Sequence, residues 1–279
     1  ELEPNNSITT AQAVSFDETI TGSISSTLDV DLYAVEVASS GRITVSFKGL
    51  GNESDGWIYG VVDSSGKVLS SRVCDRTECE TGVSSLIGIS ESGTYYVQVA
   101  SESSYWSPDS SYEFSVAFSS ETGGVELEPN NSITTAQAVS FDETITGSIS
   151  STLDVDLYAV EVANRNLLRV MLESGKRDST GWKISLLNER QELLLQTSCR
   201  ASQCKDGVTL TLAVVEPGSY FVRVSSNSAY WPPTYQYSVT ISGSELPDPP
   251  DAPQNVEASY ELFQDKIEIT WASSERADY

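Results

Sequence analysis

One stretch of the chain occurs twice, letter for letter, and this repeat constrains the fold more than any other feature of the sequence. Residues 1–38 and residues 126–163 both read ELEPNNSITTAQAVSFDETITGSISSTLDVDLYAVEVA, at an offset of 125 positions. The offset persists beyond the identical block, where it pairs Trp57 with Trp182, Cys74 with Cys199 and Cys79 with Cys204. A unit of this length has the size of a whole domain, so the period predicts two tandem domains rather than a solenoid.

Each repeat consists of short segments in which apolar and polar residues alternate, as they do in half-buried strands. Turn-forming residues separate these segments at a spacing of roughly ten residues, and a helical period is almost absent. The pattern predicts an all-β fold of two tandem antiparallel jelly-roll β-sandwiches. The strands expected in the first repeat are Thr19–Ser23, Asp31–Val37, Arg42–Phe47, Gly56–Asp63, Lys67–Ser71, Ser84–Ile89, Thr94–Ala100 and Tyr112–Phe118.

Changes in composition divide the chain into two repeats at 1–124 and 125–245, a Pro-rich linker at 246–253, and a last part at 254–279. The last part contains two expected strands, Gln254–Tyr260 and Lys266–Trp271. Together with Ala252-Pro253, they resemble the opening of a fibronectin type III domain, which has an Ig-like fold. This part is too short to bury a core of its own, so we expect a truncated stub and a natural protein that continues beyond it.

The chain is strongly acidic, with a formal net charge of −24. A surface of this kind repels nucleic acid and anionic membranes, and it favours solubility and the binding of cations. Adaptation to a salty habitat is an alternative explanation of the acidic excess. The sequence lacks a run of about 20 apolar residues, so it predicts no insertion into a membrane.

The four cysteines form two close pairs, Cys74 with Cys79 and Cys199 with Cys204. The sequence contains no histidine, and no further cysteine is at hand to complete a zinc tetrahedron, so the spacing favours two local disulfides. Disulfides persist in oxidising compartments, which indicates a secreted, extracellular or cell-surface protein. Two reduced pairs in a cytosolic protein remain an alternative.

The duplicated stretch gathers carboxylate and amide side chains at its two ends. Glu1, Glu3 and Asn5 alternate along an extended segment, and Asp29 and Asp31 project to one side from the start of an expected strand. Calcium binds six to eight oxygens of this kind. If the first segment folds back beside the strand, these side chains surround one cation. A solvated acidic tail followed by an Asx-rich turn is the alternative reading.

Several motifs in each repeat resemble the bacterial pre-peptidase C-terminal domain. They are Glu3-Pro4-Asn5-Asn6, Gly22-x-Ile24-Ser25, Asp29-Val30-Asp31-x-Tyr33, Asp63-x-x-Gly66 and Gly93-Thr94-Tyr95-Tyr96-Val97. The resemblance implies a calcium-binding jelly-roll sandwich found at the ends of secreted bacterial peptidases, with the collagen-binding domains of clostridial collagenases as relatives. The calcium ligands that it implies are Glu1, Glu3, Asn5, Asn6, Asp29 and Asp31, and Glu126, Glu128, Asn130, Asn131, Asp154 and Asp156.

The sequence indicates binding rather than catalysis. Without histidine, His-based triads and HExxH zinc sites are excluded, and the prominent acid pairs all lie in the expected calcium sites. Strand parity turns Tyr96 and Gln98 outward, with Phe221 and Arg223 in the second repeat. Tyr105, Trp106, Tyr230 and Trp231 lie on Pro-flanked loops, where they form a platform for a sugar or a peptide or else fold back onto the sandwich.

These observations predict non-catalytic, calcium-stabilised extracellular modules that anchor a larger secreted or surface-attached bacterial protein to a polymer or cell surface. The expected partners are an extracellular polymer, protein or polysaccharide, and further domains of the same polypeptide. The alternative function is a calcium-rigidified spacer between domains of an adhesin or exported enzyme, or a secretion or processing extension of a peptidase.

Overall fold

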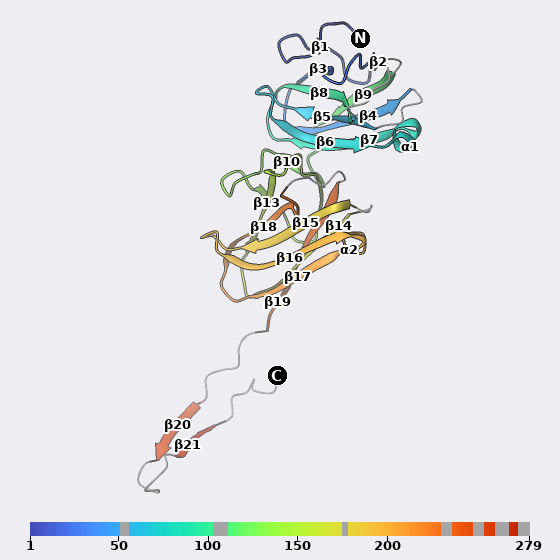
Figure 1. The fold of residues 1–279 in the computed structure, drawn as a ribbon. Coiled ribbons are helices and arrows are strands. Elements are labelled where there is room, and N and C mark those ends of the chain that lie inside the picture. The colour runs from blue at the N-terminus through green and yellow to red at the C-terminus, as the bar shows by residue number, and fades with distance from the viewer. Residues whose placement is uncertain are drawn as a thin grey trace.

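The first sandwich consists of two five-stranded sheets that face each other, and one of them includes a short strand, β10 (Leu127–Glu128), from the start of the second repeat (Figure 1). The computed structural model describes residues 1–50, 56–102, 111–174, 178–229, 236–247, 254–259 and 268–272. One sheet has the order β1 (Gln12–Ala13), β3 (Val30–Val37), β8 (Gly93–Ser101), β5 (Trp57–Val62), β6 (Val68–Cys74). The other has the order β10 (Leu127–Glu128), β7 (Val83–Ile89), β4 (Gly41–Gly49), β9 (Ser111–Ser119), β2 (Thr19–Ser23).

The second repeat has the same arrangement with one strand fewer. Its first sheet has the order β11 (Gln137–Ala138), β13 (Val155–Val162), β18 (Gly218–Ser226), β15 (Asp178–Leu187), β16 (Leu193–Ala201). Its second sheet has the order β12 (Thr144–Gly147), β19 (Tyr237–Glu245), β14 (Asn166–Glu173), β17 (Val208–Val214). In the described part of the chain no strand pairs with the outer side of β17, whereas β10 occupies the matching place on the outer side of β7. The predicted all-β sandwich fold is confirmed.

Strand parity decides which side chains enter the core. In β4, Ile43, Val45 and Phe47 are buried and alternate with more exposed residues, as the sequence pattern predicts. Trp57 and Trp182 lie at matching places in the two cores and are almost completely buried. The cores are therefore built in the same way, although the sequences differ outside the duplicated stretch.

Each repeat has a short helix that closes one end of the sandwich and carries a disulfide. In the first repeat, α1 (Arg76–Thr81) begins at Asp75, whose side chain accepts a hydrogen bond from the Glu78 backbone N–H. Cys79 on this helix bonds to Cys74 at the end of β6. The second repeat has α2 (Ser202–Lys205) and the equivalent bond between Cys199 and Cys204. Both predicted pairs are thus joined within their own loops.

The first residues of each repeat fold over the outer face of one sheet. We call residues 1–14 and 126–139 the leading segments. Strand β1 pairs in parallel with β3, and Ile8 and Ala11 cover a small cluster of Leu32, Val62 and Tyr96. In the second repeat, β11 pairs with β13, and Ile133 and Ala136 cover Leu157, Leu187 and Phe221. The leading segments therefore cover these small apolar clusters on the outer face of each sandwich.

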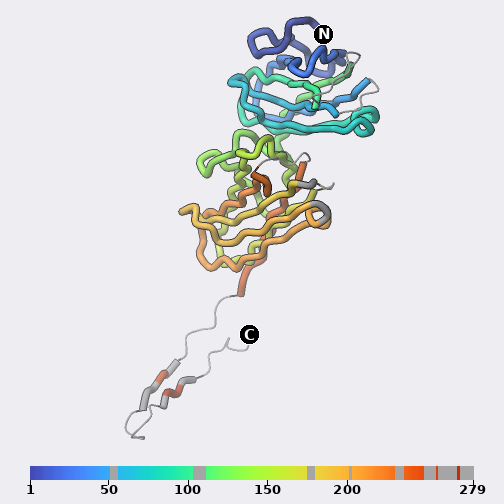
Figure 2. Tube along the Cα trace, in the orientation of Figure 1, coloured from blue at the N-terminus to red at the C-terminus, as the bar shows by residue number. Residues whose placement is uncertain are grey.

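The end of the chain contains one antiparallel hairpin, formed by β20 (Gln254–Ser259) and β21 (Glu268–Ala272). The tube view in Figure 2 draws it apart from the two sandwiches. Most of the expected Pro-rich linker lies outside the described residues, and the fibronectin type III resemblance stays a prediction. None of the helices in the described part of the chain has the length and apolar character that a membrane crossing requires.

Candidate cation sites in the two repeats

The leading segment of the first repeat brings three carboxylates together. Oxygens of Glu1, Glu3 and Asp31 all lie within 4.8 Å of one another, and we call these residues the first acidic cluster. The segment runs beside the start of β3, where the Leu32 N–H donates to the Asn5 carbonyl over 3.0 Å. The fold thus produces the convergence that the alternating Glu1, Glu3 and Asn5 led us to expect.

Backbone contacts fix the leading segment in the same way in both repeats. The Ser23 N–H donates to Glu1 Oε2 at 2.6 Å, and the Ser148 N–H donates to Glu126 Oε2 at 2.8 Å. The N–H groups of Leu2 and Leu127 each donate to a glutamine side chain, over 2.7 and 2.8 Å. The first Glu of each cluster is therefore held in one orientation by an N–H group of its own repeat.

Asp31 is held from the core side by a pair of tyrosines. The Tyr112 hydroxyl donates to Asp31 Oδ2, and it lies 2.6 Å from the Tyr33 hydroxyl. Gly22 makes room for this arrangement, because a Cβ at this position would lie 2.4 Å from the Tyr112 oxygen. The sequence analysis did not identify the role of Tyr112. The glycine of the Gly22-x-Ile24 motif was the available signal, because it indicates that a large side chain packs against this position.

The second repeat has the same tyrosine pair. The Tyr237 hydroxyl donates to Asp156 Oδ2 over 2.5 Å and lies 2.6 Å from the Tyr158 hydroxyl. Glu126, Glu128 and Asp156 have carboxylate oxygens within 4.8 Å of one another, and we call them the second acidic cluster. The two clusters are therefore built from identical residues on identical supports.

Burial distinguishes the two clusters. Glu1 and Glu3 are exposed, whereas Glu126 and Glu128 are only 3% and 2% exposed; the Asn and Asp of both sites are completely buried. Glu128 Oε1, Asn130 Oδ1 and Asp156 Oδ1 have no hydrogen-bond partner, although water does not reach them. A buried oxygen without a donor costs about 1–3 kcal/mol, and more if it is charged. These atoms have the chemistry of ligands for a cation.

The carboxylates also raise one another's pKa. Burial, followed by the charges of Glu1, Asp29 and Glu3, raises the pKa of Asp31 to about 8, against the hydrogen bond from Tyr112. Burial and the charges of Glu126 and Asp154 likewise raise the pKa of Glu128 to about 8. Burial raises the pKa of Asp156 well above its usual range. Several buried carboxylates thus resist ionising together unless a cation compensates their charge.

The side-chain oxygen of Asn5 also faces the first cluster. It has only oxygens as neighbours, and a half-turn of the amide lets the nitrogen donate to Asp31 Oδ1 and Glu3 Oε2, each at 3.1 Å. The Asn5 amide nitrogen in this orientation satisfies two of the carboxylates of the first acidic cluster.

The remaining predicted ligands interact with each other beside the clusters. Asn6 Nδ2 donates to Asp29 Oδ1 over 2.9 Å, and Asn131 Nδ2 donates to Asp154 Oδ1 over 2.7 Å. The other oxygen of Asp29 accepts from the Ser25 N–H at 2.5 Å. Asp29 and Asn6 also line an open hollow next to Glu1 and Glu3. Their role as direct ligands therefore stays a prediction.

The donor set fits a hard divalent cation. Carboxylate and amide oxygens are the ligands that calcium and magnesium take, whereas softer metals favour nitrogen and sulfur. A cation here would be held by Glu1, Glu3, Asn5 and Asp31 in the first repeat, and by Glu126, Glu128, Asn130 and Asp156 in the second. It would neutralise the carboxylates and tie each leading segment to β3 or β13.

The predicted aromatic platform needs correction. Tyr96 and Phe221 do point away from the main core, but the leading segments cover them, and each is only 8% exposed. Gln98 is half-buried and Arg223 is exposed. The predicted loop aromatics Tyr105, Trp106, Tyr230 and Trp231 lie outside the described residues. Parity gave the direction of the two rings correctly, but it could not reveal what packs over them.

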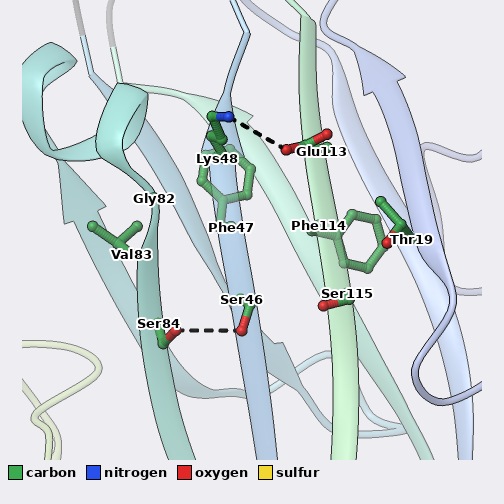
Figure 3. Close-up of a pocket in the computed structure, with 10 residues that line it drawn as sticks. All are labelled: Thr19, Ser46, Phe47, Lys48, Gly82, Val83, Ser84, Glu113, Phe114 and Ser115. Atoms are coloured by element: carbon green, nitrogen blue, oxygen red, sulfur yellow. Dashed lines mark hydrogen bonds and ion pairs between the residues drawn. The ribbon is translucent and has the colours of Figure 1, made fainter.

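The first repeat has one small hollow on the outer face of its second sheet. Figure 3 shows that Lys48 and Glu113 form an ion pair at its upper end, at 3.7 Å, while Ser46 and Ser84 approach to 3.3 Å across it. Its volume is about 230 Å³, below the roughly 300–1,000 Å³ of typical ligand pockets. This hollow is too small and too polar to replace the expected platform.

Comparison with protein families assigns the first repeat. Residues 29–101 match the family model of the bacterial pre-peptidase C-terminal domain. This part of the chain is therefore similar to that family. The pre-peptidase C-terminal domain family is non-catalytic, so the match supports a non-catalytic part of a larger protein. The matched residues contain Asp29 and Asp31, and the leading segment lies outside them. No curated protein matches the chain.

Solved structures with related shapes include another pre-peptidase C-terminal domain, that of a collagenase from Bacillus anthracis. It is 17% identical, with a TM-score of 0.31, and the alignment covers 38% of this chain and 94% of that one. The CBM22 tandem of Xyn10C from Paenibacillus barcinonensis is 10% identical, with a TM-score of 0.25, and 76% and 83% of the two chains are covered. These values are too low to support an argument about function.

Proposed function

We propose that the chain is a tandem pair of non-catalytic, calcium-stabilised modules of a larger extracellular protein. The observation that carries this proposal is the second acidic cluster, where Glu128 Oε1, Asn130 Oδ1 and Asp156 Oδ1 are buried without donors. A calcium ion in each repeat would satisfy these oxygens. It would also hold the leading segment down, so that cation binding and folding are coupled.

Calcium titration of the full chain by calorimetry tests the proposal. We expect two bound ions per chain and a higher melting temperature, because a ligand that binds only the folded state adds about 2.7 kcal/mol at a hundredfold excess over Kd. The variants Asp31→Asn and Asp156→Asn should each remove one ion. The control Asp17→Asn changes an exposed aspartate and should remove none. No binding to the wild type would refute the proposal.

Two disulfides and the family match support an extracellular location. Such bonds are maintained outside the reducing cytoplasm. The proposed role within the larger protein is either to anchor it to a polymer or cell surface, or to hold its other domains at a fixed spacing. We regard these as separate functions, because only the first requires an exposed ligand face.

The spacer role is favoured by the contact between the two repeats. Strand β10 belongs to the second repeat by sequence but pairs with β7 of the first, with Leu127 opposite Gly88 and Glu128 opposite Ile89. A shared sheet resists bending between the modules. X-ray scattering with and without a chelator tests this role: a spacer should lose its fixed dimensions when calcium is removed, and unchanged profiles would count against it.

The anchoring role draws on Arg223, which is exposed on the outer face of β18. Pull-down on collagen, chitin and cellulose in the presence of calcium is the direct assay. Retention that is lost in Arg223→Ala, with normal calcium binding, would favour anchoring. Absence of retention on all of these polymers would leave the spacer as the better account.

A further inference from the structure

The edge of the first repeat receives the leading segment of the second. Beyond the β10–β7 pairing, the Ser90 N–H and hydroxyl both donate to the Glu128 carbonyl, over 3.2 and 2.9 Å. Gln236 Nε2 donates to the Leu86 carbonyl over 2.9 Å. Figure 1 shows β10 between the two sandwiches, directly beneath the sheets of the first repeat. The contact is therefore made of backbone groups as well as side chains.

Gly88 permits this close approach. A Cβ at this position would lie 2.1 Å from the carbonyl oxygen of Glu126, which is backbone and cannot move aside by itself. Gly88 has no left-handed φ, so its own strand does not require glycine. The residue is needed by the contact between the repeats and not by the sheet to which it belongs.

Lys67 of the first repeat reaches the acidic site of the second. Its Nζ lies 3.0 Å from Asn131 Oδ1 and 3.7 Å from Glu128 Oε2. The Glu128 side chain is 1% exposed, whereas Lys67 keeps 42% of its side chain in contact with solvent. The ammonium group thus lies at the outer rim of the second acidic cluster, between the cluster and the solvent.

The matching edge of the second repeat has lost these features. At the offset of 125, Gly88 corresponds to Ala213, Lys67 to Glu192 and Ser90 to Val215. An alanine brings the Cβ that Gly88 avoids, and a glutamate would repel an acidic leading segment. Val215 is 58% exposed, and within the described residues no strand pairs with the outer side of β17.

We propose that Gly88, Ser90 and Lys67 form a docking surface specific for the leading segment of the second repeat, and that docking seals the second acidic cluster so that a cation bound there locks the repeats together. The two cation sites, although identical in sequence, then behave differently. The first exchanges its ion directly with solvent, whereas the second releases its ion only when the repeats separate. The locking step rests on the proposed calcium binding; the docking surface does not.

Two variants of the full chain test the docking surface by giving the first repeat the residues of the second. They are Gly88→Ala and Lys67→Glu, and the second repeat folds with Ala213 and Glu192 at the same places. The matched controls are Gly123→Ala, where an added Cβ meets nothing within 4 Å, and Lys48→Glu, which removes a lysine from a different sheet face. Unchanged strand signals in circular dichroism verify the fold.

The Ser90 amide donates across the contact, so its rate of hydrogen exchange measures docking whether or not calcium is present. We expect Gly88→Ala and Lys67→Glu to lose protection at Ser90 while the amides shared by β4 and β9 keep theirs. Both controls should behave as the wild type. If Ser90 stays protected in Gly88→Ala, the assignment of this surface is wrong.

The locking step is tested by the rate of Ca²⁺ release into a fluorescent chelator, measured by stopped flow. The wild type should release calcium in a fast and a slow phase, and Gly88→Ala should convert the slow phase into a fast one. A single phase in the wild type, or a slow phase that survives in Gly88→Ala, would overturn the locking. If no calcium binds, the proposed function and the locking both fail, while the exchange of Ser90 still decides the docking.

Discussion

Replacing Tyr112 with phenylalanine tests whether the tyrosine pair beneath Asp31 supports the first acidic cluster. The Tyr112 ring is completely buried and packs against Phe47, Trp57 and Phe114. Tyr112→Phe keeps these ring contacts and removes only the hydroxyl. Asp31 then loses a donor, and the hydroxyl of Tyr33 loses its neighbour at 2.6 Å.

The expected effect follows from these two lost contacts. With a pKa of about 8, Asp31 is largely protonated at neutral pH in the absence of a cation, so its hydrogen bond with Tyr112 joins neutral groups and contributes about 0.5–1.5 kcal/mol. A buried hydroxyl left without a partner costs about 1–3 kcal/mol. Because Tyr33 and Asp31 can adjust toward each other, we expect a loss of about 2–3 kcal/mol rather than the full sum. Asp31 also becomes less well oriented, so calcium affinity should fall about 10–100-fold, as it does for outer-shell partners of metal ligands.

Urea unfolding in a chelator measures the first effect, and calorimetric titration measures the second. The matched control is Tyr95→Phe, which removes a hydroxyl that donates to the Glu91 carbonyl in the turn before β8, over 3.0 Å. We expect about 0.5–1.5 kcal/mol for the control and no change in calcium affinity. The reasoning is refuted if Tyr112→Phe is no more destabilising than Tyr95→Phe and binds calcium normally.

Three further predictions concern stability. Gly147→Ala places a Cβ 2.6 Å from the Tyr237 oxygen and should destabilise the second repeat by about 1–3 kcal/mol in urea unfolding; no loss would show that the tyrosine can move. Replacing Cys199 and Cys204 together with serine opens a loop with a sequence separation of 5 and should cost about 2 kcal/mol in the chain-entropy model, measured against the oxidised wild type. Arg42→Ala breaks a surface ion pair of 2.9 Å with Glu121 and should change the free energy of unfolding by less than about 1 kcal/mol.

The fold was predictable because its signals are local. Alternating residues such as Ile43, Val45 and Phe47 mark a half-buried strand, and the duplicated stretch marks the period without reference to any contact. The disulfides were predictable for the same reason, since Cys74 and Cys79 are close in sequence. The acidic cluster needed one additional step, the return of the leading segment beside β3, and the family resemblance supplied it.

What the sequence could not reveal depends on contacts between distant segments. Tyr96 has the correct parity for an outward ring, but Ile8 and Ala11 cover it. Tyr112 supports Asp31 from 81 positions away, a relation that no spacing rule expresses. The pairing of β10 with β7 likewise places a strand of one repeat in a sheet of the other, and it depends on a glycine that its own strand does not need.

The edge that carries Gly88 and Lys67 in the first repeat differs from the matching edge of the second repeat, so further repeats can be added by the same contact at one end of the tandem only. A further unit like the first repeat, placed ahead of it, would offer a glycine and a lysine to the leading segment at Glu1 and could extend the rod by the same joint. A unit added behind the second repeat would meet Ala213 and Glu192 and would need a joint of a different design. Duplication of the first repeat therefore lengthens the array, whereas duplication of the second introduces a break in it.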